Sequence, residues 1–270
     1  MGILVNRLLA ILNEQNPETT YYYIAVTILE HITQIGDMNI NEIAELCNTS
    51  KSTISKFIRT LGYEDFSNFK YAMEMEKNRY RRSDSYIHDV SSYLEDHTYE
   101  EYAKVLARDV LANVKNMDLD GLRRLAGDIF QYRHIGAFGL MFSETAAIDL
   151  QTKLGRLGKF IMSNMDDLKQ YQYIKSAEQD TLIIIFSESG TFMERYEMTD
   201  PATGESVFSS TKAKLVMITA NEKKAKDHRL SYIVRFRYTD KVHTHRILYP
   251  FLTDVLVNEY ISLPGVRGTF

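Results

Sequence analysis

The chain of 270 residues is poor in cysteine and proline and has no long apolar run. Its single cysteine, Cys47, excludes a disulfide framework within the chain and indicates a reducing compartment. We expect a buried structural thiol there, because Cys47 continues the apolar face of a helical pattern. No run approaches the roughly 18 apolar residues of a membrane-spanning helix, and the first residues lack the basic start and apolar core of a signal peptide. These absences predict a cytoplasmic protein without a membrane partner.

An excess of positive charge is also missing. The formal net charge is −4, and residues 1–82 hold nine lysines and arginines against ten acids. This balance excludes a wholly basic nucleic-acid binder, so any contact with nucleic acid must use a small, local basic surface. With 44% hydrophobic and 25% charged residues the composition is that of a globular protein, and the length favours two domains that each bury a core.

What is present is a pattern of two short helices joined by a tight turn, between residues 39 and 69. Asn39 is placed to cap the first helix, with Glu42 three residues on as in a capping box. Asn48 tolerates the left-handed backbone that reverses the chain, Ser50 can cap the second helix, and Gly62 can end it. The apolar residues recur at helical spacing: Ile40, Ile43, Ala44 and Cys47, then Ile54, Phe57, Ile58 and Leu61. This pattern predicts a helix-turn-helix.

The polar faces of the second helix carry cations and hydroxyl groups and no carboxylate between residues 51 and 61. Such a surface suits a helix that lies against phosphates and offers short donors to base edges. We expect the bases to be read by hydroxyl groups and the phosphates to be met chiefly by cations; the predicted DNA-binding residues are Ser52, Thr53 and Ser55, and Lys51, Lys56 and Arg59. The plainer alternative is a solvated surface helix of chance composition.

The stretch 40–70 also resembles the N-terminal domain of the RpiR-type, sugar-responsive transcription regulators. The resemblance extends to the trailing segment of glycine and aromatic residues, here Gly62, Tyr63, Phe66 and Phe69. This chain has Asn48 where the family's turn often has Gly, and Thr49 where it usually has Val. Both residues are tolerable in a turn. The resemblance implies binding to a double-stranded DNA operator. A homodimer, or a higher homo-oligomer, is expected because a single helix-turn-helix gives a small footprint that a two-fold pair would double.

The rest of the chain divides into helical and strand segments according to the periodicity of its apolar residues. Apolar patterns predict helices over 3–12, 21–35, 66–82, 100–117 and 119–132, and the polar stretch 83–99 reads as a linker. Short β-branched or apolar runs then alternate with helical stretches, at 134–138, 159–163, 181–187, 214–219 and 232–235. The predicted fold class is therefore multidomain: an all-α helix-turn-helix domain (1–82), a linker (83–106), and an α/β domain with a parallel sheet flanked by helices (107–270).

In parallel sheets ligands sit at the carboxyl ends of the strands. The run 182–186 ends in a loop of hydroxyl residues and glycine at a predicted helix start, which can hold an anion such as a phosphate. From residue 134 onward the chain resembles the SIS sugar isomerase domain, in which a glycine-rich first turn and an SxSG loop embrace a phosphosugar. The resemblance implies an effector site for a phosphorylated sugar at Ser143, Ser187, Ser189, Gly190 and Thr191.

The departures from the SIS pattern fall at the same site. Met141 replaces the second glycine of the first turn and brings bulk, Glu188 adds negative charge, and the hydroxyl of Thr191 comes one place early. The stretch 199–204 interrupts the next helix. A vestigial domain that only dimerises is therefore an open alternative. The final predicted helix, 245–263, has an apolar face that suits either core or dimer packing.

An enzymatic function has less support from the sequence than a regulatory one. Aldose–ketose isomerases with a SIS domain need a general base, and the chain offers histidines in no recognisable motif: His134, His228, His243 and His245. His88 and His97 lack metal-ligand spacing, and no cofactor is indicated. The sequence favours a DNA-binding transcription regulator that is not an enzyme, over a vestigial dimer and a sugar-phosphate isomerase.

Overall fold

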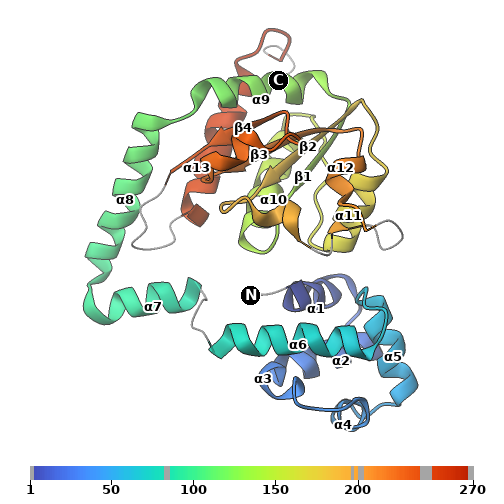
Figure 1. Ribbon diagram of the computed structural model, residues 1–270. Helices are drawn as coiled ribbons and strands as arrows, with labels where there is room; N and C mark the ends of the chain where they lie inside the picture. Colours follow the sequence, from blue (N-terminus) through green and yellow to red (C-terminus); the bar gives the residue numbers. More distant parts are fainter. Residues whose placement is uncertain (1–2, 82–85, 196–197, 200–203, 238–244, 267–270) are drawn as a thin grey trace. The chain divides into compact units, whose positions relative to one another are not determined.

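A computed structural model describes residues 3–81, 86–195, 198–199, 204–237 and 245–266. The chain forms two compact units, 1–89 and 90–270, called here the N-terminal unit and the α/β unit (Figure 1). Within the described residues no helix is long and apolar enough to cross a membrane.

The N-terminal unit is entirely helical in its described part, as predicted (Figure 1). Its helices are α1 (Ile3–Glu14), α2 (Thr20–Glu30), α3 (Ile32–Ile35), α4 (Ile40–Leu46), α5 (Lys51–Thr60) and α6 (Phe66–Arg81). Their apolar faces meet in one core, whose fully buried members include Leu4, Leu8, Ile24, Ile28, Ile43, Ile54, Phe57, Phe69 and Met73. The helix expected over 21–35 is two helices, because the backbone leaves helical geometry at His31 (φ −112°, ψ 20°).

Most of the described part of the stretch 83–99 is helical, where the sequence predicted a linker without sustained periodicity. Helix α7 (Tyr86–Asp96) occupies most of it, and α8 (Tyr99–Asn116) begins after Thr98, which caps it in a capping box with Glu101. Helix α9 (Leu119–Gln131) follows, capped by Asp118 as expected. The predicted limit between 106 and 107 falls inside α8, whereas residue 82 lies outside the described residues, and the division 1–82, 83–106 and 107–270 remains a proposal.

The α/β unit contains a parallel sheet in the order β1-β2-β3-β4. The strands are β1 (His134–Phe138), β2 (Thr181–Phe186), β3 (Lys214–Thr219) and β4 (Tyr232–Arg235), close to the predicted runs. The expected strand 159–163 is reduced to a single parallel bridge between Met162 and Gly136, with two hydrogen bonds of 2.8 Å to the backbone of Ala137 and Ile135. This segment flanks the outer side of β1.

Helices cover both faces of the sheet (Figure 1). One face packs on α9, α10 (Phe142–Arg156) and α13 (His245–Ile261) through a core that includes Leu125, Leu150 and Leu252. On the other lie α11 (Asp167–Lys175) and α12 (Val207–Ser210), where Phe138 meets Tyr173 of α11 edge-on at 5.5 Å. Because both faces are covered, every residue of β2 is buried, which explains its unbroken apolar sequence. The predicted fold class is confirmed.

The helix expected directly after the β2 loop is also shorter than predicted. Residues Thr191–Glu194 form η1, a 3-10 turn of four residues that ends where Arg195 adopts an extended backbone (φ −75°, ψ 137°). A second short turn, η3 (Glu222–Lys226), follows β3. Four residues give no helix dipole of consequence, so any anion held by this loop would depend on hydroxyl groups, amides and side-chain charge.

Candidate functional site

The turn between α4 and α5 is built by the residues that the sequence singled out. Asn39 accepts from the backbone amide of Glu42 (3.2 Å), and the Glu42 carboxylate accepts from the amide of Asn39 (2.6 Å). Asn48 has a positive φ of 46°, and Gly62 ends α5 with φ 80°. Ser50 caps α5 by accepting from the amide of Thr53 at 3.1 Å. These local bonds fix the geometry of a helix-turn-helix.

The six predicted DNA-binding residues all lie outside the core-facing side of α5. Lys51, Ser52, Lys56 and Arg59 are exposed, and Thr53 and Ser55 are half-buried, while Ile54, Phe57 and Ile58 are buried on the opposite side. The cap also holds two of the predicted base-reading hydroxyl groups, since Ser50 Oγ lies 2.8 Å from Ser52 Oγ and 2.9 Å from Thr53 Oγ1. A helix surface with exposed cations and nearby hydroxyl groups suits contact with a DNA backbone and base edges.

Cys47 ends α4 and is 1% exposed. Burial raises the pKa of its thiol to about 11, so the thiolate is scarce at neutral pH. The expected buried structural thiol is confirmed.

In the α/β unit, four of the five predicted effector residues line one pocket of about 140 Å³ at the carboxyl ends of β1 and β2. These are Ser143, Ser187, Ser189 and Thr191, while Gly190 forms the turn of the loop with φ 76°. The sequence reading missed the other lining residues: Leu140, Phe142, Phe186, Phe192 and Arg195. The volume is below the roughly 300–1,000 Å³ of pockets for drug-sized ligands, and it suits a small group such as a phosphate.

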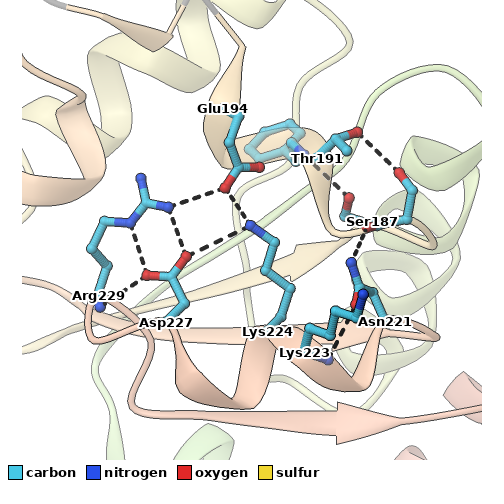
Figure 2. Close-up of polar contacts among 10 residues, drawn as sticks. Ser187, Thr191, Glu194, Asn221, Lys223, Lys224, Asp227 and Arg229 are labelled. Atoms are coloured by element: carbon cyan, nitrogen blue, oxygen red, sulfur yellow. Dashed lines mark hydrogen bonds and ion pairs between the residues drawn. The ribbon is translucent and has the colours of Figure 1, made fainter.

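Hydrogen bonds hold the β2 loop in shape (Figure 2). The hydroxyl groups of Ser189 and Thr191 lie 2.9 Å apart, Ser187 Oγ accepts from the amide of Phe192 at 3.3 Å, and the Asn221 side chain donates to the carbonyl of Ser189 at 2.8 Å. The loop is therefore anchored to the segment after β3.

A compact ionic network flanks the loop (Figure 2). Lys224 pairs with Glu194, and Arg229 bonds Asp227 at 2.6 Å and 2.9 Å and Glu194 at 3.1 Å. The bond from Arg229 lowers the pKa of the Asp227 carboxyl to about 2. A Cβ on Gly190 would lie 2.6 Å from the Lys224 side chain, so the glycine is required both for its backbone angle and for this close approach.

The first turn of the pocket is strained at Met141. This residue has φ 59° and ψ −111°, a backbone that a non-glycine residue rarely adopts, at the position where the SIS pattern has glycine. The neighbouring Gly139 cannot carry a side chain, because a Cβ would lie 2.6 Å from the backbone of Ser143. Met141 and Glu188, the two residues counted against ligand binding, both line the pocket.

Glu144 follows the pocket's Ser143 and is 1% exposed, and neither of its carboxylate oxygens has a hydrogen-bond partner. Burial, and secondarily the charges of Asp167 and Asp166, raise the pKa of this carboxyl to about 8. At neutral pH the group is therefore mostly protonated. Nothing in the sequence pattern marked it, because its burial arises only when α10 packs in the α/β unit.

No histidine whose side chain the structure describes lines the pocket. His134 opens β1, at the opposite end of the strand from the pocket, and lies 3.5 Å from Asp180 at the surface. His228 is exposed, His243 lies outside the described residues, and the His245 side chain is likewise not described. Among the described residues, no group of three or more His, Cys, Asp or Glu is arranged to hold a metal ion.

Comparison with known proteins gives consistent matches. Residues 13–79 match the helix-turn-helix domain of the rpiR family. An uncharacterized HTH-type regulator of Providencia stuartii is 25% identical over 193 residues, 70% of this chain and 67% of that protein. HexR of Pseudomonas aeruginosa is 24% identical over 196 residues, with the same coverage. Among solved structures, Vibrio vulnificus NanR complexed with ManNAc-6P is similar at a TM-score of 0.48 and 20% identity, covering 96% of this chain and 91% of that one.

The capped helix pair and the separate α/β unit define the class: a helix-turn-helix regulator with a second, parallel-sheet domain. Within that class, the match over residues 13–79 assigns the helix-turn-helix domain to the rpiR family. The chain as a whole is similar to HTH-type transcriptional regulators.

Proposed function

We propose that this protein is a cytoplasmic homodimer that binds a specific DNA operator through α5, senses a phosphorylated sugar in the β2-loop pocket, and so regulates sugar metabolism. The observation that carries the sensing proposal is the convergence of four hydroxyl side chains, one from the start of α10 and three from the segment after β2, together with Arg195, in one pocket. Hydroxyl and guanidinium donors are the groups that bind a phosphate dianion. Through the attached helix-turn-helix, binding of the sugar would change the affinity for the DNA operator.

The DNA contacts are tested by removing single cations from α5. Replacing Lys56 or Arg59 by Ala should weaken binding to all sequences and reduce the salt dependence, log Kd against log salt, by about 0.9 per lost phosphate contact. Fluorescence anisotropy with labelled duplexes selected from a random library measures both quantities. Lys212→Ala is the matched control, since it removes an exposed cation in the α/β unit that pairs with Glu178. Equal salt slopes for all three variants would show that these α5 cations do not contact the DNA phosphates.

The base contacts have a different signature. Replacing Ser52, Thr53 or Ser55 by Ala should cost about 1–3 kcal/mol at one operator position and relax the preference there, with the salt slope unchanged. Selection of binding sites from a random library by each variant identifies the position. A uniform loss at every position would mean that these hydroxyl groups only support the helix.

The effector site is tested at Ser189, whose exposed hydroxyl lines the pocket beside Thr191. Calorimetric titration of a panel of phosphosugars should find at least one that binds wild type, and Ser189→Ala should bind it about tenfold more weakly, the loss expected for a hydrogen bond of roughly 1.4 kcal/mol to a charged group. Ser209→Ala, an exposed serine of α12, is the control. Equal affinities in both variants would place the site elsewhere.

Two alternatives have distinct outcomes. In a vestigial domain the pocket binds no phosphosugar, and the strained Met141 and the acidic Glu188 would be the physical reasons. A sugar-phosphate isomerase needs a general base, and Glu188 is the acid that lines the pocket. Proton exchange at carbon 2 of the bound sugar, followed by NMR in deuterated water, would reveal turnover, and its absence with a bound sugar supports the regulator.

A further inference from the structure

Helix α8 has its polar and apolar residues in an unusual arrangement. The face packed on the α/β unit contains Val105, Asp109 and Asn113, which are 7%, 0% and 2% exposed. Asn113 is bonded to the backbone of Arg237 just beyond β4, accepting from its amide at 2.9 Å and donating to its carbonyl. The helix is thus fixed to the edge of the sheet by polar contacts.

The opposite face of α8 carries apolar residues into solvent. Leu111 is 61% and Val114 54% exposed, and Ala103 and Ala107 are exposed as well. These four residues recur at spacings of four, four and three, so they form one stripe along the helix, called here the α8 stripe. An amphipathic helix normally directs such a stripe to a core, which indicates that the stripe is covered in the assembled protein.

The exposed charges of α8 are segregated along its length. Glu100 and Glu101 lie in the first turn, whereas Lys104, Arg108 and Lys115 follow toward the carboxyl end. A parallel pair of such helices would place like charges side by side. An antiparallel pair would set the acidic end of one helix near the basic end of the other, and it would oppose the two helix dipoles favourably.

The sizes of the side chains fit the same arrangement. About a centre at Ala107, an antiparallel pair places Ala103 of one helix opposite Leu111 of the other, so a small residue receives a large one. Near Ala107 itself the two backbones can approach closely. In the same register Lys115 lies opposite Tyr99, next to Glu100.

We propose that two copies of this chain pair through the α8 stripe, antiparallel, about a two-fold axis near Ala107. Such a contact is self-complementary and closes, as a two-fold interface must. This inference rests on the proposed dimeric regulator and names the surface through which the dimer forms. Its tests measure the oligomeric state alone, so a negative result would leave the proposal of DNA binding by α5 intact.

The first test is the oligomeric state of the full chain by sedimentation equilibrium. Leu111→Glu should raise the dimer dissociation constant at least tenfold, because it introduces a carboxylate into the stripe. Phe160→Glu is the control, since Phe160 is 79% exposed in the same unit and lies outside the stripe. A wild type that stays monomeric, or an equal effect of both substitutions, would overturn the proposal.

Charge reversal distinguishes pairing of α8 with α8 of a second copy from burial of the α8 stripe by a different surface. Glu100→Lys should weaken the dimer, and combining it with Lys115→Glu should restore wild-type association. Glu100 also pairs with Lys104 within the helix at 2.7 Å, so circular dichroism checks that α8 remains folded in both variants. Failure of the second change to restore a folded variant would contradict antiparallel pairing.

Cross-linking locates the axis. Two Ala103 positions would be about 12 Å apart along the axis, beyond disulfide reach, whereas two Ala107 positions would face each other. Under mild oxidation Ala107→Cys should therefore form a covalent dimer, and Ala103→Cys should do so only when mixed with Leu111→Cys. The native Cys47 is buried and serves as the wild-type background. Equal self-cross-linking of Ala103→Cys and Ala107→Cys would indicate a parallel pair, and none at Ala107 would exclude the axis.

Discussion

Replacing Phe57 by Ala should lower the free energy of unfolding of the N-terminal unit by about 3–5 kcal/mol, the usual cost of deleting a buried ring. Phe57 is fully buried in α5 and packs edge-on against Tyr21 of α2 at 5.4 Å. Because natural domains are stable by only about 5–15 kcal/mol, much of the fold's margin would be lost. Urea unfolding followed by circular dichroism measures the change, and operator binding should fall with the folded fraction.

Tyr71→Ala is the control for that experiment, since this ring is 62% exposed on α6 of the same unit. It should change stability by no more than about 0.5 kcal/mol, the range of ordinary surface substitutions. A similar loss in both variants would mean that Phe57 is not a core residue of the helix-turn-helix.

Glu144 should make the α/β unit less stable as pH rises. Its carboxyl has a pKa of about 8 when folded, against an ordinary value of 4.5. Between these values the folded state holds a proton that the unfolded state has released, so stability falls with rising pH, by up to about 1.4 kcal/mol per pH unit. Below the ordinary pKa both states are protonated, and above about 8 both are ionised. The window of change is therefore about pH 4.5 to 8.

Glu144→Gln tests this directly, because the amide has the shape of the protonated acid and cannot ionise. Variant and wild type should unfold alike near pH 5, and the variant should be more stable at pH 8, by on the order of 3 kcal/mol. Glu178→Gln is the control at an exposed carboxylate. If Glu144→Gln has the same pH profile as wild type, the carboxyl is not held protonated in the folded protein.

The helix-turn-helix was predictable because its signals are local. Asn39, Glu42, Ser50 and Gly62 each act through backbone groups within a few residues, and the structure places them in the expected roles. The four strands were predictable for a related reason: a parallel strand buried on both faces must be apolar throughout, as β2 is.

The two misses have different causes. Residues 159–163 contain a short apolar run, but Phe160 is 79% exposed and Met162 forms a single bridge to β1, so the segment is a bridge at the edge of the sheet. The linker prediction over 83–99 took polar composition for irregular structure and missed α7, whose helical residues are mixed with acids and serines.

The pocket was predictable in part. Strand ends and hydroxyl residues pointed to Ser187, Ser189 and Thr191, and all three line the pocket with Ser143. Arg195 reaches the same pocket because η1 turns the chain after the β2 loop, and no sequence spacing encodes that turn in advance. The buried Glu144 likewise follows from the packing of α10 and not from its neighbours in sequence.

The most direct test of the whole account is the operator affinity of the full chain with and without each phosphosugar of a panel, for wild type and Ser189→Ala. If the sugar regulates DNA binding, it must bind the DNA-competent and DNA-incompetent states of the protein with unequal affinity. At least one phosphosugar should therefore change the operator Kd of wild type by about fivefold or more. Ser189→Ala should bind the operator normally and respond only at higher sugar concentration. If a phosphosugar binds wild type in the pocket and leaves the operator Kd unchanged, or if the wild-type response is identical in Ser189→Ala, the coupling of this pocket to DNA binding is contradicted.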